Sequence, residues 1–240
     1  MSAVLHAIAG GIATLTLNRP ESRNALNREM CDLLISISRE ISLNKEIKIA
    51  LVRANGSVFC AGADLKERQG MGKEQVRERR MKGFAAYAAL EGLPMPVIAV
   101  VQGPAVGSGC EIAGACDFIV ATPAASFRTP EALRGTVGAT QRLPRILGKR
   151  LAKDLMFTGR ELSAMEARDA GLVARLVADA DLESTLDEIR KKILNAPPSS
   201  LRLAKRCIDR GVELDPQGAL DAEIAAIDEQ LAAGSWMGKR

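Results

Sequence analysis

The spacing of apolar and polar positions changes several times along the chain and predicts a mixture of strands and helices. Apolar residues at 3–8 and 12–17 flank Gly10-Gly11, a pair typical of a hairpin turn, and predict two short strands. Helical spacing follows Asn27, which can cap a helix running to about Leu43. An alternating, β-branched segment at 47–54 predicts a third strand.

The alternation of strand and helix continues through the middle of the chain. A charged helix is expected first, and two prolines end it before a short, fully apolar run that is typical of a buried strand. The recurring order of strand, strand and helix indicates stacked ββα units. The expected elements are a helix, a strand, a glycine-rich turn, a short helix and a strand at 73–90, 97–101, 103–109, 110–115 and 117–121.

Beyond Gln141 the pattern becomes mostly helical. Ser163 and Glu166 have the spacing of a capping box, and a last short strand is expected at 173–177. We therefore divide the chain into a mixed α/β core at 1–180 and a helical region at 181–240. The helices predicted in that second region lie at 182–194, 199–210 and 216–232.

Composition narrows the classes of function. The chain has 240 residues, 47% of them apolar, which is enough to bury a full core, but only 3% are aromatic. Few rings are therefore available for stacking on bases, and a net charge of +4 does not demand a nucleic-acid partner. Arg77, Arg79, Arg80 and Lys82 form the densest basic run. Interleaved glutamates make a solvated helix face the expected interpretation, with an anion contact as the alternative.

The five cysteines predict reduced thiols and a cytoplasmic protein. Their number is odd, and no Cys-x-x-Cys pair or histidine cluster accompanies them, so no metal site is expected. The first residues lack the basic start and long apolar stretch of a signal peptide. No apolar run reaches the roughly 18 residues of a spanning helix, so no membrane association is expected.

Two glutamates indicate chemistry beside a carbonyl group. Glu111 and Glu131 each follow a segment able to present backbone N–H groups, and 61–63 is a third segment of this kind. Two N–H groups held about 3 Å from a thioester oxygen stabilise the negative charge that develops there, and one such donor is worth roughly 3 kcal/mol. The plainer interpretation is that these bends are ordinary turns and that the carboxylates merely favour helix N-termini.

Other catalytic motifs fail on inspection. Residues 107–109 resemble the start of a dinucleotide fingerprint, but Ile112 stands where its third small residue is required. Ser108 lacks the flanking glycines of a nucleophile elbow, because Val106 and Cys110 occupy those positions. His6, the single histidine, lies in an expected edge strand and is no partner for Ser108.

Five segments, taken in order, resemble the crotonase superfamily and in particular enoyl-CoA hydratases. Each segment is weak evidence alone, whereas five in register are specific. They are Asn18-Arg19-Pro20 with Asn24-Ala25-Leu26-Asn27, then Val58 to Glu67, Gly103 to Asp117, Gln141 to Arg145, and Ala167 to Val173.

This resemblance implies a fold, an assembly and a set of roles. The fold is a spiral of ββα units with a C-terminal helical trimerisation region, usually within a hexamer built as a dimer of trimers. The N–H groups of Ala63 and Ser108 correspond to the oxyanion donors, Glu111 to the base and Glu131 to the acid. The substrate would be an acyl-CoA thioester, without a separate cofactor or metal. Matches to CoA-contacting positions are Arg23, Ala25, Ala61, Asp64, Leu65 and the tail residue Lys239.

One departure from the family pattern bears on the reaction. Gly138-Ala139 leads directly into Thr140, whereas hydratases carry a longer glycine-rich loop before the corresponding position. A shorter loop here can enlarge the acyl pocket, move Glu131 or alter the reaction. The nearest alternative is an enoyl-CoA isomerase, followed by a CoA-thioester hydrolase, cyclase or decarboxylase on the same scaffold. A non-catalytic RNA-binding member is the remaining alternative.

Overall fold

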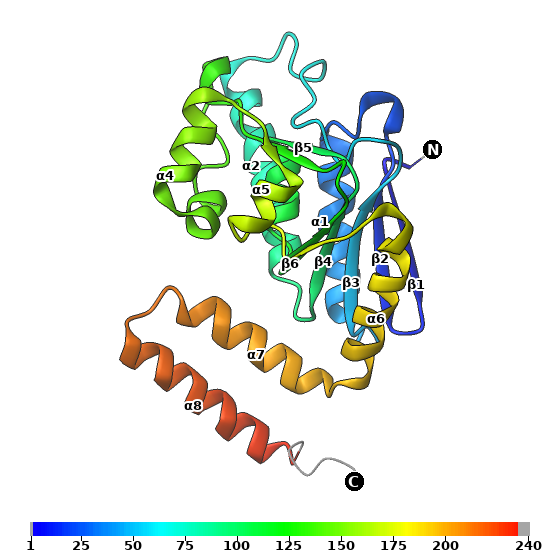
Figure 1. Cartoon of the computed structure of the whole chain (residues 1–240), viewed down its shortest axis with the longest axis vertical. Coiled ribbons are helices and arrows are strands. Elements are labelled where there is room, and N and C mark those ends of the chain that lie inside the picture. The colour runs from blue at the N-terminus through cyan, green and yellow to red at the C-terminus, as the bar shows by residue number, and fades with distance from the viewer. Residues whose placement is uncertain (1, 235–240) are drawn as a thin grey trace.

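A six-stranded sheet forms the centre of the molecule (Figure 1). The structure, a computed structural model, describes residues 2–234. The strand order is β1-β2-β3-β4-β6-β9, in which β1 and β2 form the predicted antiparallel hairpin and all other neighbours are parallel. The strands are β1 (Val4–Ala9), β2 (Ile12–Leu17), β3 (Ile49–Ala54), β4 (Val97–Val101), β6 (Phe118–Ala121) and β9 (Arg175–Leu176).

A smaller three-stranded sheet has the order β5-β7-β8, with β5 (Pro104–Val106), β7 (Ser126–Arg128) and β8 (Leu162–Ser163). The chain passes from the large sheet to the small one and then into a helix twice, as β4-β5-α3 and as β6-β7-η2. Successive strands of each pass lie parallel and side by side. The predicted spiral of ββα units is therefore confirmed.

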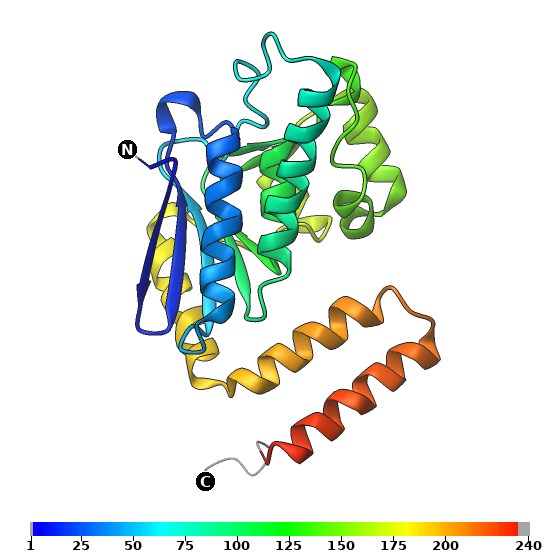
Figure 2. The same cartoon turned by 180° about the vertical axis from the view of Figure 1, so that it is seen from behind.

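Alternating side chains of β3 pack on opposite faces of the large sheet, as a strand buried on both sides requires. Ala50 and Val52 face the main core, which α1 (Arg28–Leu43) and α2 (Lys73–Glu91) cover (Figure 2). Helix α1 begins where it was predicted, because the side chain of Asn27 accepts a hydrogen bond from the amide of Met30 over 2.9 Å.

The opposite face of the sheet is covered by α6 (Leu182–Asn195), whose Leu186 and Ile189 pack on Ile49 and Leu51. This helix is therefore part of the core around the large sheet. A boundary at residue 180 would separate α6 from the strands that it buries.

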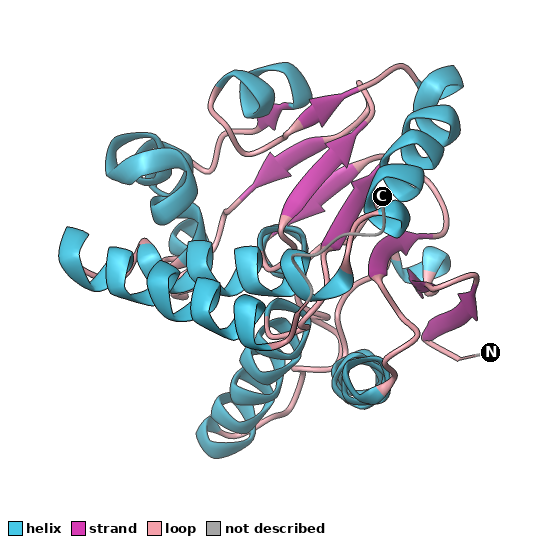
Figure 3. Cartoon of the chain, turned by 90° about the horizontal axis from the view of Figure 1, so that it is seen from below, coloured by secondary structure: helices cyan, strands magenta, loops and turns pink. Residues whose placement is uncertain are grey.

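Two further helices, α7 (Pro198–Gly211) and α8 (Pro216–Ala232), form a hairpin beyond this body (Figures 1 and 3). The hairpin leaves several large apolar side chains exposed, whereas only Leu203 and Ala226 are buried in it. Exposed apolar side chains along α7 and α8 are Ile208, Leu220, Ile224, Ile227 and Leu231.

The remaining elements are α-helices and short 3₁₀-helices. Ser163 and Glu166 form the predicted capping box, in which the Glu166 amide donates to Ser163 Oγ over 3.2 Å. No helix within residues 2–234 is long and apolar enough to cross a membrane. These elements are α3 (Ser108–Gly114), α4 (Arg142–Thr158), α5 (Ala164–Asp169), η1 (Pro20–Ser22), η2 (Ala132–Arg134) and η3 (Asp179–Asp181).

The segment predicted as a glycine-rich turn at 103–109 differs in the structure. Its centre is strand β5, and α3 begins at Ser108 rather than at Cys110. Pairing of β5 with β7, more than twenty positions later, makes this segment extended, and such a partner cannot be seen in a local pattern. Gly107 then turns the chain into α3 with a φ of 51°.

Candidate active site

Two loops are fixed side by side by backbone contacts that exclude side chains. The amide of Val106 donates to the carbonyl of Cys60 over 2.8 Å, and Cys60 forms a bridge with Ala105. A Cβ at Gly109 would lie 2.4 Å from the Cys60 carbonyl oxygen. Glycine at 109 is therefore required for the bend at 61–63 to approach the start of α3.

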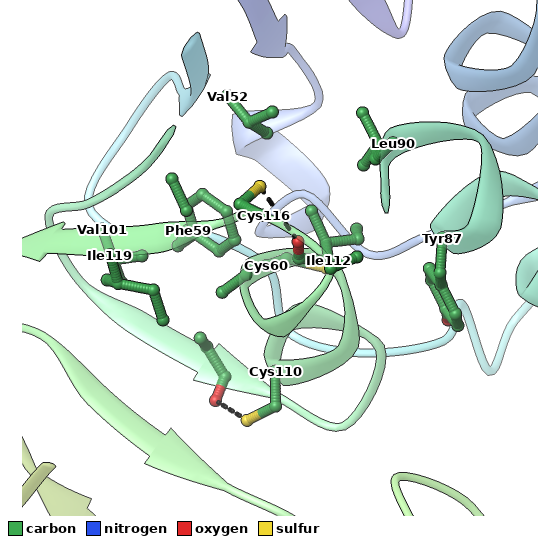
Figure 4. Packing of buried hydrophobic residues seen from close by; sticks show 14 of the residues in the cluster. Val52, Phe59, Cys60, Tyr87, Leu90, Val101, Cys110, Ile112, Cys116 and Ile119 are labelled. Atoms are coloured by element: carbon green, nitrogen blue, oxygen red, sulfur yellow. Dashed lines mark hydrogen bonds between the residues drawn. The ribbon is translucent and has the colours of Figure 1, made fainter. Parts of the chain in front are cut away.

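Buried hydrophobic side chains pack next to this junction (Figure 4). Cys60 and Cys110 are fully buried beside Phe59 and Ile112, and the Cys110 thiol donates to the carbonyl of Ala105 over 3.0 Å. All five cysteines are free thiols, as their number and spacing predicted.

Ala63 and Ser108 line the same cavity, which has a volume of about 390 Å³. Leu26 bonds to both neighbours of Ala63, donating to Gly62 and accepting from Asp64, so the Ala63 N–H is directed away from Leu26. Ser108 is the first residue of α3, where an N–H has no intrahelical acceptor. Within residues 2–234 neither amide donates to a protein group.

Both predicted glutamates line this cavity and carry an oxygen without a partner. Glu111, on α3, is 6% exposed. Its Oε2 accepts from Nη1 of Arg142 over 2.8 Å, whereas its Oε1 is buried and unpartnered in the described part of the chain. Glu131 precedes η2, and its Oε2 is likewise buried without a partner there. The structure thus brings together the four residues predicted for the reaction centre.

The surroundings give the two carboxyl groups different electrostatics. Burial raises the pKa of Glu111, and the guanidinium of Arg142 opposes that rise. Burial also raises the pKa of Glu131, the negative charge of Glu111 adds to the rise, and Arg134 and Arg80 oppose it at longer range. Of the two carboxyl groups, Glu111 alone has a cation from residues 2–234 bonded directly to it.

Arg142 links Glu111 to a second acid. Its Nη2 donates to Oε2 of Glu91 over 2.6 Å, and the guanidinium lies 5.8 Å from the ring centroid of Tyr87. Burial raises the pKa of Tyr87, and an interaction with the Ser108 side chain opposes that rise. Sequence reasoning placed Arg142 within a family motif but gave it no role. The motif was the available signal, and no sequence signal marked Tyr87.

Among the residues predicted to contact CoA, Ala61 and Leu65 line the cavity. Leu65 is 54% exposed, so this side of the cavity opens to solvent. Arg23 and Ala25 do not line it, although the carbonyl of Arg23 accepts from the Ala61 amide over 3.0 Å. Lys239 lies outside the described residues.

The carboxylate of Asp64 is held by hydrogen bonds to other protein groups. Its side chain is nearly buried and accepts from Nη1 of Arg19 over 2.9 Å and from the Lys66 amide over 3.0 Å. Burial opposes ionisation of Asp64, but these hydrogen bonds and the charge of Arg19 lower its pKa. Contact of Asp64 with CoA stays a prediction, because the carboxylate does not line the cavity.

The interpretation of the basic run as a solvated helix face was wrong for two of its members. Arg79 is 5% exposed, and its Nε donates to Oε2 of Glu67 over 2.5 Å. Arg80 lines the cavity and donates to the hydroxyl of Thr136. Both partners belong to loops outside the helix, so the interleaved glutamates of the helix gave no sign of them.

The shortened loop packs directly on Glu131. A Cβ at Gly138 would lie 3.1 Å from Cγ of Glu131, and one at Gly107 would lie 2.2 Å from its Oε1. Val137 and Ala139 also line the cavity. The absence of a side chain at Gly107 and at Gly138 thus leaves the space that the Glu131 side chain occupies.

No group of three or more histidine, cysteine, aspartate or glutamate side chains within residues 2–234 is arranged to hold a metal ion. Two backbone donors and two carboxyl groups around one cavity instead define a site suited to proton transfer beside a carbonyl group.

Comparisons with known proteins identify the class. The profile of the enoyl-CoA hydratase/isomerase family matches residues 7–234, and the chain therefore belongs to that family. A Bacillus subtilis relative, YngF, whose name includes both activities, is 40% identical over 224 residues, which cover 92% of this chain and 86% of the relative.

Solved structures agree with this assignment. An enoyl-CoA hydratase from Bacillus anthracis is 36% identical with a TM-score of 0.91, and the match covers 94% of this chain and 90% of that one. A Thermobifida fusca protein solved in complex with acetoacetyl-CoA is 26% identical with a TM-score of 0.88, over 97% and 96% of the two chains.

Proposed function

We propose that this protein adds water across the 2,3-double bond of 2-enoyl-CoA thioesters. The observation that carries the proposal is that one cavity holds two unpartnered backbone amides and two carboxyl oxygens without protein partners in the described part of the chain. In the proposed complex the thioester oxygen lies between the N–H groups of Ala63 and Ser108. These donors stabilise the enolate-like charge that forms as water adds.

The proposed proton transfers follow from the different surroundings of the two acids. Glu111, kept as a carboxylate by Arg142, takes a proton from water while the water oxygen bonds to C3. Glu131, whose protonated form burial and the charge of Glu111 favour, donates a proton to C2. The product is a 3-hydroxyacyl-CoA, and proton exchange with solvent resets the pair.

The substrate class is supported by a relative rather than by this chain alone. The Thermobifida fusca protein was solved in complex with acetoacetyl-CoA, and its fold matches almost the whole length of this chain. We propose the same type of ligand here, an acyl-CoA thioester, with its nucleotide portion outside the cavity beyond Leu65. The proposed steps use no metal ion or separate cofactor.

An assay with two substrates tests the proposal. A hydratase removes the absorbance of the conjugated thioester from a 2-enoyl-CoA, whereas an isomerase generates that absorbance from a 3-enoyl-CoA. Isomerisation is the second candidate, because the name of the family includes both activities. Undiminished hydration in a Glu111→Gln variant would remove Glu111 from the proposed mechanism.

We also propose that the α7–α8 hairpin mediates self-association into a trimer or a hexamer. Its exposed Ile208, Ile224 and Ile227 form apolar surface that a monomer would leave in water. Light scattering after gel filtration tests this proposal. We expect Ile224→Glu to lower the measured mass to that of one 25.6 kDa chain, and an unchanged mass would contradict the role of the hairpin.

A further inference from the structure

Three arginines line the cavity without a carboxylate partner in the described part of the chain. They are Arg68, Arg80 and Arg134. Other arginines at the site are neutralised, since Arg79 bonds to Glu67 and Arg142 bonds to two glutamates. The cavity therefore has more positive than negative charge available to a ligand.

Two of these arginines lie on the Glu131 side of the cavity. Arg80 comes from α2 and Arg134 from η2, and both are close enough to Glu131 to lower its pKa. The bend at 61–63, with the donor proposed for the thioester, comes from a different loop. An acyl chain held at the thioester and at Glu131 would therefore extend toward Arg80 and Arg134.

The environment of Arg80 is unusual for the wall of a purely apolar pocket. Arg80 is half-buried, and the only hydrogen bond of its guanidinium within residues 2–234 goes to the neutral hydroxyl of Thr136. A partly desolvated cation without a counter-charge is costly, and a carboxylate would offset that cost through a two-pronged hydrogen bond. Leu26, Phe84 and Val106 on the same cavity provide apolar contacts for a short carbon stem.

We propose that the acyl group of the substrate carries a second anionic group, a carboxylate at the end remote from the thioester, which Arg80 and Arg134 bind. This inference rests on the proposed function for the reaction, although the binding preference can be measured without turnover. The CoA phosphates are another source of negative charge, and the ligands below separate the two.

Calorimetry with two unreactive thioesters of equal carbon count tests the proposal. Glutaryl-CoA ends in a carboxylate and pentanoyl-CoA in a methyl group. We expect the wild-type protein to bind glutaryl-CoA about tenfold or more tightly, as charge-assisted hydrogen bonds allow. Arg80→Gln and Arg134→Gln should each weaken the binding of glutaryl-CoA more than that of pentanoyl-CoA and so remove most of this preference.

Arg77→Gln is the matched control, because Arg77 is on α2, is exposed and does not line the cavity. We expect it to keep the wild-type preference. Equal wild-type affinity for the two thioesters would overturn the proposal. So would Arg80 and Arg134 variants that lose affinity for pentanoyl-CoA and free CoA as strongly as for glutaryl-CoA, because that result assigns the arginines to the CoA phosphates.

A kinetic comparison separates this inference from the proposed reaction. Hydration of glutaconyl-CoA should exceed that of 2-pentenoyl-CoA in kcat/KM by about tenfold, and the arginine variants should bring the two values together. Hydration of both substrates without a preference would overturn the carboxylate site and leave hydration standing. A binding preference for glutaryl-CoA without hydration of either enoyl thioester would support the site and remove the proposed reaction.

Discussion

Nη1 of Arg142 donates to Oε2 of Glu111 over 2.8 Å, while Oε1 of the same carboxyl group is buried and has no partner within residues 2–234. One oxygen is thus held by a cation and the other is available to a water molecule. The contact opposes the effect of burial on the pKa of Glu111 and so favours the ionised form that a base requires.

Loss of this contact should move the acidic limb of the pH profile. Arg142→Gln removes the charge that lowers the pKa of Glu111, so that pKa rises and the acidic limb of kcat/KM for crotonyl-CoA moves to higher pH. We expect roughly a tenfold loss in kcat/KM at neutral pH, the effect of losing one charge-assisted hydrogen bond. Stopped-flow or steady-state assays across pH measure it.

Two further variants control this experiment. Arg142→Lys keeps the charge and should leave the acidic limb nearer its wild-type position. Glu91→Gln removes a negative charge that raises the pKa of Glu111, so the limb should move slightly to lower pH. If the acidic limb moves in the same direction in the Arg142→Gln and Glu91→Gln variants, the charges of Arg142 and Glu91 do not explain the shift. Damage to the packing around Glu111 would then explain it.

Removal of either carboxyl group should disable hydration. Glu111→Gln and Glu131→Gln keep the size of the side chain but abolish proton transfer, for which losses of about 10²–10⁴ in kcat are expected. Glu74→Gln on α2 is a suitable control, because Glu74 is exposed and has no ion pair in the described chain. A residual rate within tenfold of wild type in either site variant would exclude that residue as a proton-transfer group.

Local signals in the sequence predicted much of the fold. The cap at Asn27, the hairpin at Gly10-Gly11 and the capping box at Ser163 each depend on residues a few positions apart, and the structure contains all three. Strand β5 escaped prediction because its partner β7 is distant in the chain and its own three residues have no clear period.

In the site, too, features that depend on nearby residues were predictable, whereas contacts between distant residues were not. The bends and both glutamates were visible as motifs, and the structure places them around one cavity. The contact between Arg142 and Glu111 spans 31 positions, and Arg80 meets Thr136 across 56. Such contacts depend on how α2, α3 and α4 pack, so residue types and spacing could not reveal them.

The space around Glu131 predicts a strict requirement for glycine at 107. Gly107→Ala would add a Cβ 2.2 Å from Oε1 of Glu131 and strain a backbone with φ of 51°. We expect loss of hydration by at least tenfold together with about 1–2 kcal/mol of stability. Gly171→Ala also places a side chain on a backbone with positive φ, 84°, but in open space, and should lose stability but retain activity. Urea unfolding and kcat/KM, measured on both variants, separate the two effects.

Asn24 should be the most sensitive polar residue beneath the site. It is fully buried, and its Nδ2 donates to the carbonyls of Asn55 and Val58 over 2.8 Å each, while its Oδ1 accepts from the Arg19 amide. Asn24→Ala removes three part-buried hydrogen bonds to backbone groups, at roughly 1 kcal/mol each, so we expect a loss of about 3 kcal/mol in the free energy of unfolding.

Loss of the Asn24 side chain should also disturb the proposed oxyanion donors. The residues on either side of Asn24 hold the bend at 61–63, because the Ala61 amide donates to the carbonyl of Arg23 and the Leu26 amide donates to the carbonyl of Gly62. Asn44→Ala is the matched control, since its side chain makes one exposed hydrogen bond, to the Glu46 amide, and its loss should cost about 1 kcal/mol or less. Urea denaturation gives both values. Equal losses in the two variants would show that the network around Asn24 does not hold the loops together.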